Sequence, residues 1–150
     1  MISINGMAHV MINVSHWEDC CRFYNALLPF FGMKLVFSGE DTVYYVGGRT
    51  ALGINRVYPP DDKERFNQKR VGLHHLCFRA KNRGDIDILY SHLMEIDAKI
   101  VHEPELGGWA PGYYSILFED PSGTRLELNY VPGAGVLATD VNFDPGNDYK

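Results

Sequence analysis

The stretch Thr50–Val57, TALGINRV, is matched further along the chain by Thr124–Val131, TRLELNYV, which is identical to it at four of eight positions. The difference that matters most is Gly53 in the first copy against Glu127 in the second. A carboxylate on an otherwise apolar strand is a candidate functional group, and the first copy lacks it.

Two further pairs of stretches align in the same way. His9–Val14 (HVMINV) lies over His75–Ala80 (HLCFRA), and Gly32–Glu40 lies over Asp97–Glu105. The three offsets are 74, 66 and 65 residues, so one unit occurs twice, with a longer connection inside the second copy. Each unit is marginal in size by itself, and we expect residues 1–150 to fold as one domain.

Composition excludes several classes of function. The 150 residues are 45% apolar and 22% charged, with a net charge of -5, which leaves no basic face for nucleic acid. No apolar run is long enough to span a membrane, and the N-terminus does not resemble a signal peptide. Three cysteines, two of them adjacent, predict free thiols in a reducing cytoplasm. A small molecule is the expected partner.

Hydrophobic periodicity predicts the order βαβββ in each repeat, and hence an α+β fold. Ser15 and Glu18 form a capping-box pattern at the start of the first helix, and Gly47-Gly48 is typical of a hairpin turn. The expected divisions are repeat one at about 7–57, a linker at 58–72, repeat two at 73–131 and an irregular tail at 132–150. The predicted elements are strands at 9–14, 34–37, 42–46, 50–57, 73–80, 99–102, 113–119 and 125–131, with helices at about 15–29 and 83–96.

Strand alternation separates an apolar face, which packs against the helices, from a polar face in each repeat. His9, His75 and Glu127 all lie on the polar faces, at equivalent or paired repeat positions. Two imidazoles and one carboxylate suit a divalent metal with open coordination positions, and Zn, Ni, Mn, Co or Fe would all be compatible. We therefore predict one metal or polar ligand site at these residues, with Glu127 as the catalytic candidate.

Further residues on the polar faces are candidates for substrate binding. They are Asn13, Asn55, Arg79, Trp109 and Asn129. The Gly/Pro-rich stretch Pro104–Gly112 is predicted to be a loop and a lid over the pocket. His74 alternates to the opposite face and is expected to be structural, and Cys77 is expected to act as a small hydrophobic residue.

From Ala8 to about Val131 the chain resembles the vicinal oxygen chelate superfamily, which includes glyoxalase I, methylmalonyl-CoA epimerase, extradiol dioxygenases, fosfomycin-resistance transferases and bleomycin-resistance proteins. The motifs that carry the resemblance are AHVMINV, FYNALLPFFGMKLV, GLHHLCFRA and FEDPSGTRLELNY. It implies a homodimer and two βαβββ repeats in an eight-stranded, incompletely closed cup. The cup is formed either within one chain or across the dimer. It also implies that His75 and Glu127 are metal ligands.

Two departures from the family pattern narrow the function. Gly53 stands where glyoxalase I and the epimerase typically place a fourth ligand, and Leu117 stands where extradiol dioxygenases usually carry a tyrosine. The hypothesis is a metal-dependent glyoxalase-like lyase or isomerase that acts on a small substrate with vicinal oxygens. The alternatives are a non-haem iron dioxygenase and a non-catalytic resistance-type binding protein. No general base is identifiable from the sequence.

Overall fold

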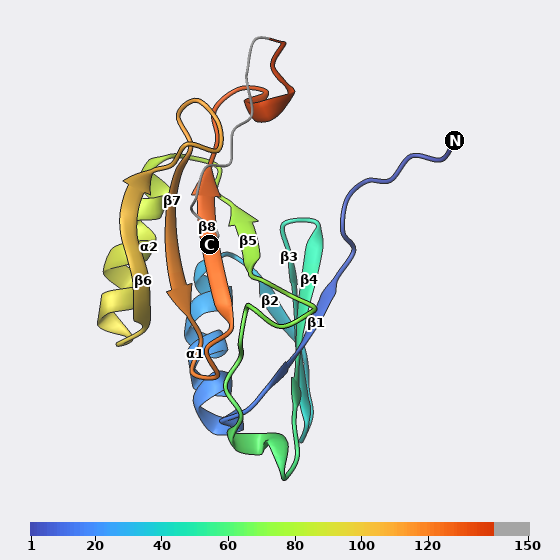
Figure 1. Ribbon diagram of the computed structural model, residues 1–150. Coiled ribbons are helices and arrows are strands. Elements are labelled where there is room, and N and C mark those ends of the chain that lie inside the picture. The colour runs from blue at the N-terminus through green and yellow to red at the C-terminus, as the bar shows by residue number, and fades with distance from the viewer. Residues whose placement is uncertain (140–150) are drawn as a thin grey trace. The chain divides into compact units, whose positions relative to one another are not determined.

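The structure, a computed structural model, describes residues 1–139 of the chain (Figure 1). It contains two compact units, Met1–Phe66 and Asn67–Lys150, and each is described by itself. The boundary between them falls inside the predicted linker, which holds one short 3-10 helix, η1 (Asp61–Lys63). The expectation that residues 1–150 form a single domain stays a prediction.

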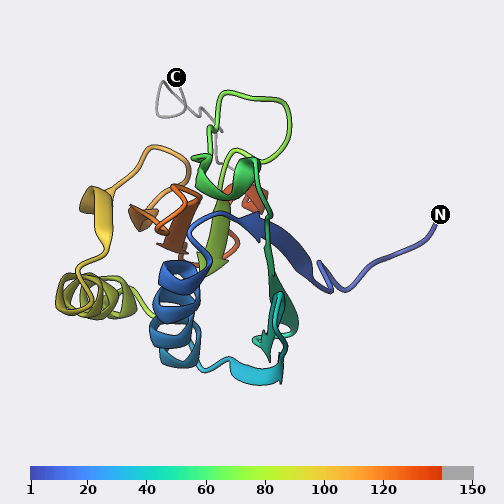
Figure 2. The same ribbon diagram turned by 90° about the horizontal axis from the view of Figure 1, so that it is seen from below.

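The first unit is a βαβββ repeat. Its elements are β1 (Val10–Val14), α1 (Trp17–Phe30), β2 (Lys34–Ser38), β3 (Thr42–Gly47) and β4 (Thr50–Arg56). The four strands form one sheet in the order β1-β4-β3-β2, with β1 parallel to β4 and the other neighbours antiparallel. Helix α1 lies beside this sheet (Figure 2) and buries Tyr24, Leu27 and Leu28.

The second unit repeats this topology. Its elements are β5 (Leu76–Arg79), α2 (Gly84–Glu95), β6 (Lys99–Leu106), β7 (Tyr114–Glu119) and β8 (Arg125–Tyr130), followed by the 3-10 helix η2 (Gly135–Leu137). The sheet order is β5-β8-β7-β6, again with the first pair parallel. The α+β fold of two βαβββ repeats, predicted from the sequence, is confirmed.

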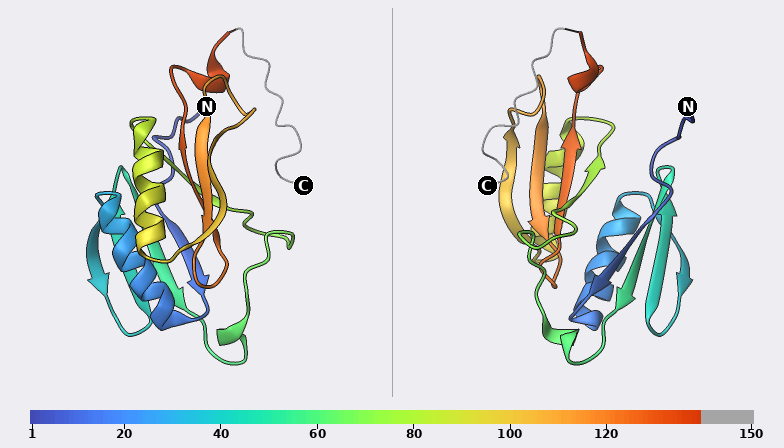
Figure 3. Two further views of the ribbon diagram at one scale, coloured as in Figure 1. Left: turned by 90° about the vertical axis from the view of Figure 1, so that its left-hand side faces the viewer. Right: turned by 45° about the vertical axis from the view of Figure 1, so that its right-hand side comes forward.

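Alternate burial, which the pattern predicted, is clear on β1 and β3, whereas consecutive residues are buried on β4, β7 and β8 and every residue of β2 is exposed. In the second unit α2 lies along one face of its sheet (Figure 3) and contributes Ile86, Leu89 and Leu93, none of which has exposed surface. The sheet side chains buried on strands β7 and β8 include Ile116, Phe118, Leu126 and Leu128. The opposite face is left for polar groups, so the helix fixes which side of the sheet can carry a site.

The strand pairing shows that the repeat alignment is structural. Val10 pairs with Leu52 in the first unit, and Leu76 pairs with Leu126 in the second. One step further along, Met11 pairs with Gly53. The equivalent pair in the second unit is Cys77 with Glu127. Gly53 and Glu127 therefore occupy equivalent places in their sheets.

The predicted capping box is wrong. The residue that caps α1 is His16, which has a left-handed backbone (φ 50°) and makes no side-chain cap hydrogen bond. The Ser15 hydroxyl instead donates to the carbonyl of Glu64 in the linker. The Ser15 hydroxyl, which the local pattern assigned to the start of the helix, thus forms a hydrogen bond with a residue distant in the sequence instead.

The predicted hairpin turn is wrong by one residue. Gly48 and Arg49 both have positive φ (58° and 65°), which is the signature of a type I′ turn, while Gly47 ends β3. In contrast, the sequence Asp120-Pro121-Ser122-Gly123, whose proline and glycine predict a type I turn, does form a turn: the Gly123 N–H donates to the Asp120 carbonyl at 2.9 Å.

Strand β6 is longer than predicted and reaches Leu106, so the predicted loop at Pro104 begins three residues too early. The strand lies at the edge of its sheet, and its pairing with β7 is irregular between His102 and Glu105. Proline has no backbone N–H to donate to a neighbouring strand. A strand tolerates it at the edge of a sheet or at a bulge, where that hydrogen bond is not needed.

Two glycines with open surroundings test the turn assignment. An added Cβ would meet nothing within 4 Å at Gly48 or Gly84, but only Gly48 has a positive φ. We expect Gly48→Ala to lower the free energy of unfolding by about 1–2 kcal/mol, because alanine is strained in the left-handed region. Gly84→Ala, at the start of α2, should raise it by about 0.4–1 kcal/mol. Urea denaturation measures both, and equal effects would contradict the assignment.

Candidate functional site

The open face of the second sheet carries a buried carboxylate. Glu127 is in the middle of β8, between Cys77 on β5 and Leu117 on β7, and its exposed fraction is 4%. A carboxylate that has lost its water must find donors within the protein. Its neighbours therefore decide whether it is a structural group or a functional one.

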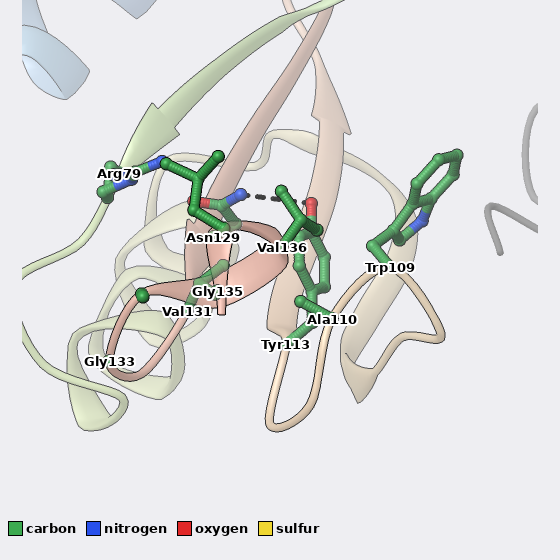
Figure 4. Close-up of a pocket in the computed structure, with 11 residues that line it drawn as sticks. Arg79, Trp109, Ala110, Tyr113, Asn129, Val131, Gly133, Gly135 and Val136 are labelled. Carbon is green, nitrogen blue, oxygen red and sulfur yellow. Dashed lines mark hydrogen bonds between the residues drawn. The ribbon is translucent and has the colours of Figure 1, made fainter. Parts of the chain in front are cut away.

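The two oxygens of Glu127 have different partners. Oε1 accepts a hydrogen bond from the Tyr113 hydroxyl at 2.5 Å, and that hydroxyl accepts one from the Asn129 amide at 3.2 Å (Figure 4). Oε2 lies 3.2 Å from Nε2 of His75. One oxygen is thus held by a tyrosine within a chain of hydrogen bonds, and the other faces an imidazole.

These partners keep Glu127 ionised. Burial by itself would raise the pKa of the carboxyl group, but hydrogen bonds from His75, Tyr113 and Ser115 outweigh burial and lower the pKa below its ordinary value. Burial and the bond to the carboxylate raise the pKa of the Tyr113 phenol, so Tyr113 stays a neutral donor at ordinary pH.

His74 holds the second nitrogen of His75. The Nδ1 atoms of the two rings are 2.8 Å apart, and the rings meet edge to face. Burial first, then the charges of His75 and Arg125, lower the pKa of His74, which favours its neutral ring. His74 supports the orientation of His75, whereas the sequence pattern had assigned it only a structural place on the opposite face.

In the first unit, His9 is exposed and comes directly before β1, just as His75 comes directly before β5. Asn13 and Asn55 lie side by side in the register of β1 and β4, and the Asn55 amide is 3.5 Å from Oδ1 of Asn13. Thr42 donates to Asn55 at 2.9 Å. The two predicted asparagines therefore form one polar group on the open face of this sheet.

The place equivalent to Glu127 is filled by a methionine. A Cβ added to Gly53 would lie 2.2 Å from Sδ of Met11 and 2.9 Å from a ring carbon of Tyr44. A carboxylate at this position would have to displace the Met11 side chain. The first sheet supplies no acidic ligand from Gly53, and the thioether covers the backbone there.

The donors fit a divalent metal in chemistry. No three His, Cys, Asp or Glu side chains of residues 1–139 are gathered as a metal site. Within the second unit, however, His75 and Glu127 place an imidazole nitrogen and a carboxylate oxygen 3.2 Å apart, and each is held from behind by another side chain. Metal ligands in proteins are typically supported in this way. His9, the third predicted ligand, belongs to the first unit.

A hollow of about 290 Å³ opens beside this group in the second unit. Three of the predicted substrate residues, Arg79, Trp109 and Asn129, line it together with Tyr113 (Figure 4). The remaining walls are apolar and come largely from the segment 133–137. Neither Glu127 nor His75 is among the residues that line the hollow, but Tyr113 lines it and donates to Glu127, so this side chain links the two.

Comparison with known proteins identifies the family. The model of the Glyoxalase/Bleomycin resistance protein/Dioxygenase superfamily matches residues 6–128. The chain belongs to this superfamily. The match includes all three predicted metal ligands and ends one residue before Asn129.

Individual relatives agree with this assignment. The chain is 30% identical to the metallothiol transferase FosB of Shouchella clausii over 126 residues, which cover 84% of this chain and 80% of that protein. It is 27% identical to the uncharacterized protein YqjT of Bacillus subtilis over 81% of this chain and 96% of that one. A crystal structure of a candidate glyoxalase from Bacillus halodurans superposes with a TM-score of 0.75 at 30% identity, over 85% and 96% of the two chains.

Several residues of this superfamily member were missed from the sequence. Tyr113 and Ser115 share the polar face of the last hairpin with Glu127, and alternation along the predicted strand at 113–119 could have revealed them. The segment 133–137 was expected to be irregular, and no local pattern indicates that η2 lines a hollow.

The predicted lid is also smaller than expected. The loop between β6 and β7 is closed by hydrogen bonds from the Gly107 N–H to the Tyr113 carbonyl and from the Tyr113 N–H to the Ala110 carbonyl, both at 3.0 Å. Ala110 is buried. Movement of this loop on ligand binding stays a prediction.

The Tyr113–Glu127 pair can be tested against a matched surface pair. Tyr113→Phe should raise the pKa of Glu127 and lower the free energy of unfolding at pH 7 by about 1–3 kcal/mol, because a buried carboxylate loses a donor. A carboxyl group whose pKa is lowered in the folded protein contributes stability that is lost as the pH falls through that pKa. The free energy of unfolding of Tyr113→Phe should therefore fall less on acidification than that of the parent protein. Carbon-13 NMR titration and denaturation of the metal-free protein measure the two effects.

Tyr90→Phe is the control. Tyr90 donates to Glu103 at 2.9 Å on the surface of the same unit, so its loss removes a similar bond without touching the buried carboxylate. We expect no change in the Glu127 pKa and little change in stability. Equal effects of the two substitutions would show that Glu127 does not depend on Tyr113.

Proposed function

We propose that this protein is a metal-dependent, glyoxalase-like lyase or isomerase that acts on a small substrate with two neighbouring oxygen atoms. One divalent ion would be held by His9, His75 and Glu127. The observation that supports this most is the buried Glu127 carboxylate, whose Oε2 lies 3.2 Å from His75 Nε2 while its other oxygen is held by Tyr113.

A divalent ion held there would polarise the substrate oxygens and stabilise negative charge that develops on them. The task of the surrounding residues is orientation. Tyr113 and Ser115 fix the carboxylate, and His74 fixes the ring of His75 through its Nδ1 atom. A ligand held in this way loses little freedom when it binds, which favours affinity.

Substrate binding is assigned to the residues along the hollow and to the polar group of the first unit. Asn129 and Arg79 offer donors, and Trp109 offers an aromatic face. Asn13 and Asn55 would add polar contacts from the first unit. Apolar walls exclude water from the reacting oxygens and strengthen the electrostatic contacts there.

A thiol transferase that depends on a metal is the second candidate. Its support is the 30% identity to the metallothiol transferase FosB together with Gly53, where Met11 takes the space of a fourth protein ligand. With three protein ligands, more positions stay open for substrate oxygens. The dioxygenase alternative has less support, because the residue beside Glu127 on β7 is Leu117, which has no proton to give.

We also propose that two copies of the chain associate and that the protein works in the cytoplasm. Its three cysteines are free thiols, and no helix among residues 1–139 is long and apolar enough to cross a membrane. Light scattering during gel filtration tests whether two copies associate, since the mass of a dimer is twice the 17.0 kDa of the chain.

Metal binding tests the proposal before any substrate is known. The parent protein should bind about one Ni²⁺ or Mn²⁺ ion per chain, and His75→Ala and Glu127→Ala should each weaken binding by about a hundredfold or more. His102→Ala is the control, because the partners of the His102 side chain within residues 1–139 are Glu103 and Glu105, which lie beside it on an edge strand. Calorimetry and elemental analysis give the values. Parent-like affinity in the His75 variant would overturn the site.

Activity assays on the metal-loaded protein separate the candidate reactions. A lyase or isomerase converts its substrate without consuming free thiol or oxygen. A transferase consumes thiol in proportion to product, and a dioxygenase takes up oxygen. Binding of small molecules without any metal requirement would instead support the resistance-type binding protein and overturn all three enzymes.

A further inference from the structure

The hollow of the second unit is not explained by membership in the superfamily. The family match ends at residue 128, yet seven of the eleven residues that line the hollow come after that point. The segment 133–137, which includes η2, forms much of the wall. The hollow is therefore built largely by this chain's own C-terminal segment, and its chemistry must be read from these residues.

One positive charge lies at the hollow, beside apolar side chains. Among residues 1–139, Arg79, the last residue of β5, is the only charged residue that lines the hollow, and its side chain is exposed. Trp109, Val136 and Leu137 are among the apolar residues of the lining. Within residues 1–139, no carboxylate is paired with the Arg79 guanidinium group. An unpaired guanidinium group beside an apolar wall favours a ligand that brings an anion and an apolar body together.

The other polar groups of the hollow are already engaged. The Tyr113 hydroxyl donates to Glu127 and accepts from Asn129, so its hydrogen is not available to a ligand. Asn129 pairs with Arg79 in the register of β5 and β8, which places its remaining amide capacity next to the guanidinium group. A ligand anion would meet Arg79 and Asn129 at one end of the hollow, while the Glu127 carboxylate stays behind the tyrosine.

We propose that the hollow binds a small organic carboxylate, with its charged group on Arg79 and its apolar body against Trp109 and η2. A singly charged group matches the one cation of the described lining, and a planar carboxylate can accept two parallel hydrogen bonds from a guanidinium group. The volume of about 290 Å³ is at the lower end of the usual range for ligand pockets, so the molecule is small. The inference rests on the proposed function in that this carboxylate is taken to be the substrate.

Benzoate and its neutral analogue benzamide are the probes. The full chain contains two tryptophans, so Trp17→Phe leaves Trp109 as the fluorescent reporter of the hollow. In metal-free protein with this background, benzoate should bind about tenfold more tightly than benzamide, because a charged hydrogen-bonding pair is formed only with the anion. Equal affinities for the two probes would overturn the proposal.

Substitutions locate the effect. Arg79→Gln should abolish the preference for benzoate, Arg79→Lys should keep most of it because the charge remains, and Arg49→Gln at the exposed β3–β4 turn should change nothing. Leu137→Ser should weaken both probes to a similar, small degree, since the Leu137 side chain lines the hollow but is 86% exposed and carries no charge. A preference for benzoate that survives Arg79→Gln would show that the anion binds elsewhere.

Metal content measured on the same samples separates this proposal from the proposed function. His75→Ala should lose the metal and keep the preference for benzoate. Arg79→Gln should keep the metal and lose the preference for benzoate. Normal metal binding with no discrimination between the probes would overturn the carboxylate hollow alone. Discrimination between the probes in a parent protein that binds no divalent metal would overturn the proposed enzyme alone.

Discussion

A carboxylate with 4% exposure in the middle of a β-strand is stable as an anion only when donors replace the water it has lost. Glu127 meets this condition through Tyr113, Ser115 and His75. These residues come from three parts of the unit: the loop before β7, the strand β7 itself and the segment before β5. The arrangement around the carboxylate therefore depends on the pairing of β5, β8 and β7, with α2 covering the other face so that polar groups gather on this one.

The need of a buried carboxylate for hydrogen-bond donors also explains why the two repeats carry different residues at equivalent places. In the first unit the place equivalent to Glu127 is Gly53, and the Met11 side chain lies over it. A second buried acid would need its own set of donors, and the first sheet offers Thr42, Asn13 and Asn55, which already bind one another. Two copies of one topology thus carry different chemistry. The second unit provides a charged, supported group, and the first provides a polar surface and His9.

Much of the fold and of the candidate site could be predicted from the sequence, because period-two alternation and the internal repeat both indicate which residues share a face of a strand. The βαβββ order, the apolar faces, the turn at Asp120 and the equivalence of Gly53 with Glu127 all follow from those patterns. The predictions that were wrong concern residues whose position depends on contacts with residues distant in the sequence. The Ser15 hydroxyl binds the linker instead of the helix, and Pro104 continues an edge strand because a bulge accommodates it. Strand alternation at 113–119 could have revealed Tyr113, whereas η2 lines the hollow because of packing that no local pattern contains.

We propose that His9 of the first unit and His75 and Glu127 of the second bind one and the same metal ion. Pulsed electron paramagnetic resonance on the Cu²⁺-loaded protein counts coordinated imidazole rings through the modulation from their remote nitrogens. The account predicts two imidazoles in the parent protein, one in His9→Ala and one in His75→Ala. A single imidazole in the parent protein, unchanged by His9→Ala, would contradict it and confine any metal to the second unit.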